Sequence, residues 1–170
     1  MKSLRCIPYV FVLICMVFAA TTASAENRSD SMSVGISGTI QTAQTDIMLP
    51  IWISRNIVIA PTIGLSYIQD AGTDLELAFV TRMFLTRKTV TPFIGARAGT
   101  IIYSPSTGTS LHDYLVGLCA GGEYFFGEKL SVGIEAQVNL GIDDSQSTRF
   151  GTLGGKALST GTMVYATIYF

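Results

Sequence analysis

Apolar and polar residues alternate along most of the chain after position 25, most regularly over residues 129–142. Even positions there are apolar, while odd positions are small, polar or charged. Successive side chains of a β-strand point to opposite faces, so this pattern predicts a strand with one continuous hydrocarbon face. No segment has the spacing of an amphipathic helix. The period of two recurs in seven further segments: 32–40, 46–54, 56–67, 75–85, 90–102, 112–126 and 160–170.

The connections between these eight segments alternate in character. Tight turns are predicted around residues 54–56, 86–89 and 127–128, and longer or Gly-containing loops at 41–45, 69–73, 104–110 and 143–159. An antiparallel meander places its tight turns at one edge and its loops at the other, and an even number of strands brings both termini to the same edge. We therefore predict an all-β fold, an eight-stranded antiparallel up-and-down β-barrel.

The apolar face of such a barrel points inward in a soluble lipocalin-like protein and outward to lipid in an outer-membrane protein. An eight-stranded barrel has room inside only for its own side chains, which favours the face that is rich in Gly and Ser as the lumen. The strands also match the roughly 9–11 residues of a tilted membrane-crossing strand. We therefore predict a transmembrane barrel whose lumen holds a structural charge network of five residues: Glu76, Arg82, Arg97, Glu123 and Glu135.

Aromatic residues gather near the predicted strand ends. Their positions favour girdles at the two membrane surfaces, although aromatic residues also prefer strands in general. The residues concerned are Tyr67, Tyr103, Tyr114, Tyr124, Phe126, Tyr165, Tyr169 and Phe170.

The last ten residues, GTMVYATIYF, end in an aromatic residue preceded by apolar residues at alternating positions. Here the sequence resembles the small eight-stranded bacterial outer-membrane β-barrel family, and VTPFIGARAG (90–99) and FGEKLSVGIEAQ (126–137) also look like strands of that family. The loops are shorter than those of barrels that act as adhesins. The resemblance implies a monomer in contact with outer-membrane lipid and lipopolysaccharide. It also implies a signal for the barrel-assembly machinery, formed by Val164, Ala166, Ile168 and Phe170.

The first 25 residues have the three parts of a secretory signal peptide: a basic start, an apolar run over 7–20 and an A-x-A site at 23–25. The run is shorter than the roughly 20 residues of a membrane-spanning helix. A lipid-modified Cys15 would need a small residue before it, and Ile14 stands there. The predicted domains are a cleaved signal peptide, 1–25, and an outer-membrane barrel, 26–170. The mature protein is expected in the cell outer membrane after export to the periplasm.

Composition agrees with a barrel. Charged residues make up 14% of the chain, against about 25% in average proteins, which excludes a disordered chain. The formal net charge of −1 excludes a nucleic-acid binder. A positive mean hydropathy alone would suggest a helical membrane protein, but no run of 18 apolar residues follows position 25. Removing the signal peptide leaves Cys119 as the single cysteine, so neither an internal disulfide nor a Cys-based metal site is expected.

Candidate catalytic chemistry is limited to the single histidine, His112. A lipid-modifying enzyme would need a serine and an acid within hydrogen-bond reach of it. Ser110 and Asp113 are near in sequence, but adjacent residues of a strand point to opposite faces. Asp143 and Asp144 are interpreted as the solvated start of a loop. We therefore expect no catalytic, cofactor-binding or metal-binding residues, and no cofactor.

These observations predict a non-enzymatic outer-membrane barrel with a side-chain-filled lumen. Its role would be structural in the envelope or in surface interactions through the loops 104–111 and 143–159. Three alternatives remain open at this point: a lipid-modifying outer-membrane enzyme, a narrow channel for small solutes, and a soluble secreted binding barrel.

Overall fold

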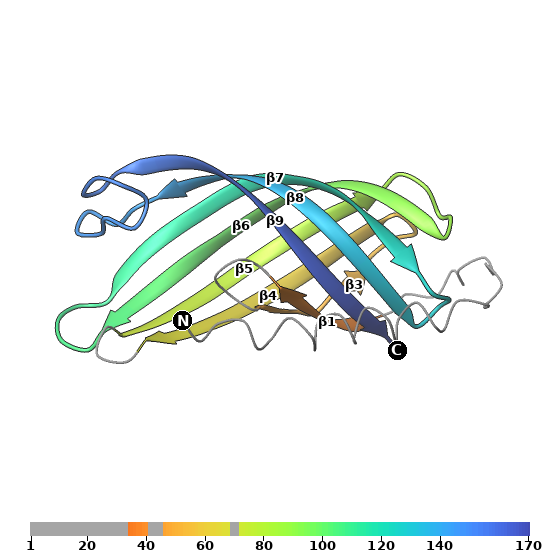
Figure 1. Ribbon diagram of the computed structural model, residues 1–170, viewed down its shortest axis with the longest axis horizontal. Helices are drawn as coiled ribbons and strands as arrows, with labels where there is room; N and C mark the ends of the chain where they lie inside the picture. The colour runs from red at the N-terminus through yellow and green to blue at the C-terminus, as the bar shows by residue number, and fades with distance from the viewer. Residues whose placement is uncertain (1–33, 41–45, 69–71) are drawn as a thin grey trace, which may run out of the picture.

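The computed structural model describes residues 34–40, 46–68 and 72–170, so the predicted signal peptide lies outside the described residues. Every strand pairing in it is antiparallel, and β2 pairs with both β1 and β4, which closes the sheet into a barrel (Figure 1). The strands are β1 (Gly35–Ile40), β2 (Asp46–Met48), β3 (Ile51–Trp52), β4 (Ile57–Ile68), β5 (Gly72–Phe84), β6 (Val90–Pro105), β7 (Leu111–Phe125), β8 (Leu130–Ile142) and β9 (Lys156–Tyr169).

The predicted fold class is confirmed: the structure is an eight-stranded antiparallel up-and-down barrel. The second strand, predicted as continuous over 46–54, is interrupted between β2 and β3. Pro50 has no backbone N–H to donate to a neighbouring strand, which explains an interruption at this point. Both halves still pair with β4, so they count as one strand of the barrel. No helix in the described residues has the length and apolar character needed to cross a membrane.

The two faces of the strands differ as the alternation predicts. Side chains at even positions of β8 point outward, and Ile134 among them is 59% exposed, whereas the neighbouring Glu135 is completely buried. The same arrangement holds in β7, where Leu118 is 69% exposed beside the buried Cys119. The apolar face therefore covers the outside of the barrel.

The end of the lumen beside the tight turns is filled by aromatic rings. Phe84 lies at the centre, stacked on Trp52 at 4.9 Å between ring centroids and edge-to-face with Phe93 at 5.5 Å. Phe125 and Tyr169 complete the cluster. This end is therefore closed by hydrocarbon rather than by small polar groups.

Two of the aromatic residues predicted for the girdles lie inside instead. Tyr165 and Tyr169 are buried in the lumen, because odd positions of β9 point inward. Tyr67, Tyr114, Tyr124 and Phe170 are exposed, as a girdle requires. Aromatic residues at strand ends thus point either into the lumen or outward. Whether a residue stands at an inward or an outward position of the alternating pattern decides which.

The connections fall into two groups at opposite ends of the barrel, which we call the short-turn end and the long-loop end. The tight turns follow Trp52, Phe84 and Phe125. At the long-loop end, to the left in Figure 1, the strands run further than predicted, so the connections shorten to 106–110 and 143–155. The last strand in particular begins at Lys156 and not at residue 160.

A glycine in the lumen makes room for Tyr165. Gly133 lies directly opposite Tyr165 in the register of β8 and β9, and a Cβ at this position would overlap the phenol ring. Gly133→Ala is therefore expected to destabilise the barrel by about 1–3 kcal/mol, the usual cost of overpacking. Chemical denaturation of the refolded protein measures this change. Gly122→Ala is the matched control, because nothing lies within 4 Å of a Cβ there; an equal loss in both variants would contradict the packing argument.

Candidate functional site

The five charged residues predicted for the lumen are all buried. Arg82 Nε donates to Glu135 Oε2 at 2.8 Å, and Arg97 Nη2 donates to Glu76 Oε1 at 2.8 Å. Each arginine thus has a carboxylate partner inside the barrel, the condition under which buried charge is tolerated.

Glu123 is held by hydroxyl groups and not by an arginine. Tyr165 and Tyr169 each donate a hydrogen bond to its carboxylate at 3.0 Å, and Ser131 donates a third. The guanidinium of Arg82 in turn lies 4.3 Å from the centroid of the Tyr165 ring. The two inward tyrosines therefore connect the lumen charges to the aromatic cluster.

Two amides that were not singled out from the sequence join the ion pairs. The Gln137 side chain accepts a hydrogen bond from Arg97 and donates one to Glu135 Oε1 at 2.9 Å. Asn139 Nδ2 donates to the same Gln137 oxygen at 3.2 Å. Both residues occupy polar positions of the alternating pattern in 129–142, so parity would have identified them.

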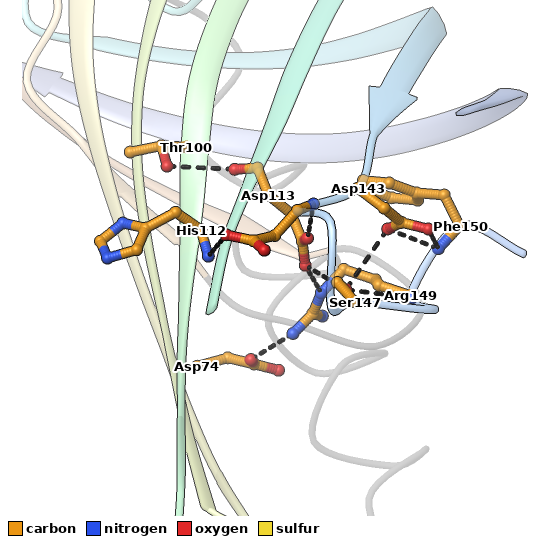
Figure 2. Close-up of polar contacts among 9 residues, drawn as sticks. Asp74, Thr100, His112, Asp113, Asp143, Ser147, Arg149 and Phe150 are labelled. Atoms are coloured by element: carbon orange, nitrogen blue, oxygen red, sulfur yellow. Dashed lines mark hydrogen bonds and ion pairs between the residues drawn. The ribbon is translucent and has the colours of Figure 1, made fainter. Parts of the chain in front are cut away.

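A second polar cluster, at the long-loop end, was not predicted (Figure 2). Its centre is Asp113, which is completely buried. Asp113 accepts hydrogen bonds from the backbone N–H of Asp144 at 2.9 Å, from Ser147 Oγ at 3.1 Å and from Arg149 Nε at 2.9 Å. All three donors belong to the 143–155 loop, so one carboxylate of β7 holds that loop.

Arg149 links the loop to a second strand as well. Its guanidinium bridges Asp113 of β7 and Asp74 of β5, as Figure 2 shows. Burial lowers the pKa of Arg149, but the hydrogen bonds and charges of Asp74 and Asp113 outweigh this and raise it overall. Arg149 therefore stays charged and holds the 143–155 loop over the long-loop end of the barrel.

The prediction that Asp143 and Asp144 form a solvated loop start is wrong for Asp143. This side chain is buried and accepts a hydrogen bond from the backbone N–H of Phe150 at 3.0 Å. The Phe150 ring lies against Gly141, where a Cβ would contact it. Asp144 is partly exposed and accepts from the N–H of Gln146 at 3.1 Å.

The hydrogen bonds to Asp144 predict how the loop responds to acid. The backbone N–H of Gln146, followed by the backbone N–H of His112 and the hydroxyl of Ser145, lowers the pKa of Asp144 below its ordinary value of 3.8. A lowered folded-state pKa means that the stabilisation is present above pH 3.8 and is lost as pH falls through the folded value. We expect hydrogen exchange in residues 143–155 to be constant from pH 8 to 5, after correction for intrinsic rates, and to accelerate below about pH 4. Asp144→Asn should weaken this acceleration; loosening near pH 6 would contradict the assignment.

The single histidine does not join a catalytic arrangement. His112 is exposed on β7 and its ring points away from the polar cluster, while Asp113 beside it points inward (Figure 2). Cys119 is a free, buried thiol. In the part of the chain that the structure describes, no group of three or more His, Cys, Asp or Glu residues is arranged to hold a metal ion.

The side chains of the predicted assembly signal face outward. Val164, Ala166, Ile168 and Phe170 are exposed along the last strand, alternating with buried residues. Recognition by the assembly machinery itself stays a prediction.

Comparison with solved structures shows the fold. Neisserial surface protein A (NspA) superposes with a TM-score of 0.54 at 13% identity, over 82% of this chain and 94% of that one. The N-terminal β-barrel domain of Pseudomonas aeruginosa OprF superposes with a TM-score of 0.50 at 13% identity, over 86% and 100% of the two chains. No protein-family profile and no curated protein sequence matches the chain. The chain thus has the fold of small eight-stranded outer-membrane β-barrels.

Proposed function

We propose that this barrel is an integral protein of the bacterial outer membrane. The observation that carries the proposal is its continuous outward apolar face on a closed sheet, since a closed barrel leaves no unsatisfied strand edge in lipid. Cell fractionation tests it. Recovery in the detergent-soluble outer-membrane fraction is expected, whereas recovery in the periplasm without detergent would support a soluble binding barrel instead.

The filled lumen favours a structural role over a channel. The short-turn end is closed by aromatic rings, and the middle by the Arg82–Glu135 and Arg97–Glu76 pairs. Porin channels need about 16 strands. Planar-bilayer recordings on the refolded protein are expected to be silent, and reproducible conductance steps would favour the narrow channel.

The role we propose is structural in the envelope or in surface interactions through the loops 104–111 and 143–159. The buried carboxylate of Asp113 and the bridging Arg149 hold the second loop in one conformation, which suits a recognition surface. The lipid-modifying alternative has less support, because His112 and Asp113 point to opposite faces. His112→Ala should leave lipid A acylation unchanged, and altered acylation would favour the enzyme.

Assembly in the membrane is proposed to depend on the outward residues of the last strand. We propose that the barrel-assembly machinery recognises Val164, Ala166, Ile168 and Phe170. These residues are exposed at alternating positions and so form one apolar face. The finished barrel would be a monomer surrounded by outer-membrane lipid and lipopolysaccharide. Deleting Phe170 should lower the amount of folded barrel in the membrane; unchanged insertion would contradict this role.

A further inference from the structure

β9 extends well beyond the strand beside it. On one side β9 pairs with β8 along its whole length, up to Lys156 opposite Ile142. On the other side β1 pairs with it only as far as Val164, opposite Ile40. Among the described residues, no strand pairs with this second edge over 156–163. The β8–β9 hairpin therefore projects past its neighbour, at the upper left of Figure 1.

The chain itself is too short to cover the outer part of this edge. Five residues join Ile40 to Asp46, which extends either strand by about two residues at most. Val34 lies beside Phe170, ten residues along β9 from Thr160 or roughly 33 Å. The eight residues 26–33, which precede Val34 once the predicted signal peptide is removed, span at most about 29 Å. An occupant of the edge must therefore come from another molecule.

The backbone groups that face the open edge can be identified from the hydrogen-bond pattern. Odd residues of β9 bond to the β8 side, as Tyr169 N–H does to Lys129 C=O, and even residues bond to the β1 side, as Phe170 N–H does to Val34 C=O. This alternation is the rule in antiparallel sheets. The N–H and C=O groups of Lys156, Leu158 and Thr160 therefore point out of the sheet.

The edge lacks the features that usually prevent pairing. It contains no proline, and its single charge, Lys156, stands at its end. Leu158 is 73% exposed, and both Ser159 and Gly161 are exposed on the opposite face. In the adjacent loop, Arg149 is instead turned inward to Asp113 and Asp74, and Asp143 is buried. The unpaired edge of β9 therefore presents one cation, Lys156, and one large apolar side chain, Leu158.

We propose that this edge, Lys156–Thr160, binds an extended segment of a partner protein, which adds to the barrel wall as a further strand. Backbone hydrogen bonds give such binding its affinity and alternate side chains give it specificity. Lys156 and Leu158 lie on the same face two residues apart. The partner segment therefore carries an acidic residue and an apolar residue separated by one position. Hydrocarbon offers no hydrogen-bonding groups, so lipid does not satisfy this edge.

This proposal makes the surface role proposed above more specific. It rests on that role in one respect only: the end of the β8–β9 hairpin must lie outside the hydrocarbon of the membrane. The test is a displayed library of random nine-residue peptides, selected against the mature protein, residues 26–170, in detergent micelles. Enriched peptides should have alternating sequences with acidic and apolar residues at the spacing given above. Because the assay works in detergent, it can succeed or fail independently of where the barrel resides in the cell.

Matched variants decide whether binding uses the edge. Thr160→Pro removes an outward N–H without touching the bonds to β8, and proline is tolerated where an edge N–H faces solvent. Thr160→Pro should lower the affinity for the enriched peptides by about tenfold. Thr160→Ala, which keeps the N–H, should change this affinity less than about twofold. Lys156→Gln should lower the affinity for peptides that carry the acidic residue by about two- to fivefold. Heat-shifted gel mobility reports whether each variant still forms the barrel.

Three results would overturn the proposal. One is a selection that enriches no peptide, and another is enriched peptides that bind folded Thr160→Pro as well as they bind the natural sequence. The third is self-association of the protein that Thr160→Pro abolishes, since the edge would then pair with a second copy.

Discussion

Glu135→Ala is expected to destabilise the barrel by about 3–5 kcal/mol, among the largest effects of any single substitution in the lumen. Glu135 is completely buried and accepts a hydrogen bond from Arg82, itself 2% exposed. Removing the carboxylate leaves the guanidinium without its ionic partner in a region of low dielectric constant. It also removes the acceptor for Gln137 Nε2, which is left without this bond.

Equilibrium unfolding in urea, with the protein refolded into lipid vesicles, measures this loss. Glu128→Gln, an exposed turn residue, is the control and should stay within about 0.5 kcal/mol. The double variant Arg82→Met with Glu135→Leu should recover most of the stability, because neither member of this ion pair is left buried without the other. A loss below 1 kcal/mol for Glu135→Ala would show that Arg82 is solvated in the folded barrel.

Ile134→Arg is expected to cost about 2–4 kcal/mol when the barrel is folded in a bilayer. Ile134 lies near the middle of β8 and points outward. If this face contacts lipid, the guanidinium enters the hydrocarbon. If the face contacts water, the same substitution on an exposed strand position costs little.

Unfolding of the bilayer-inserted protein again provides the measurement. Thr152→Arg, at an exposed position of the 143–155 loop, is the matched control and should be neutral. The effect should also shrink as the arginine is moved toward either end of β8. A small, position-independent cost would contradict contact of this face with lipid.

The barrel could be predicted because one physical rule, the opposite facing of successive side chains, applies along every strand. Parity alone placed Glu135 inside and Ile134 outside. It also placed Tyr165 and Tyr169 inside, but the prediction of girdles rested on their location near strand ends and so overlooked parity.

The polar cluster at the long-loop end could not be predicted in the same way. Arg149 meets Asp74, 75 residues away, only because the barrel closes and brings β5 and the 143–155 loop to one mouth. Asp143 stands at the odd position directly after the alternating segment, so extending the parity by one residue would have placed it inside. Ser147 and Arg149 lie further into the loop, where no period applies. The overhang of β9 also depends on the register with β1, which alternation does not fix.

Contact of the outward face with lipid is the central claim, and nitroxide accessibility in reconstituted bilayers tests it most directly. Spin labels at Ile134 and Val138 should collide readily with oxygen, which concentrates in hydrocarbon, and rarely with a water-soluble nickel chelate. A label at Thr152 should show the reverse. Strong relaxation of the Ile134 and Val138 labels by the nickel chelate would contradict the account, because it would place the apolar face in water.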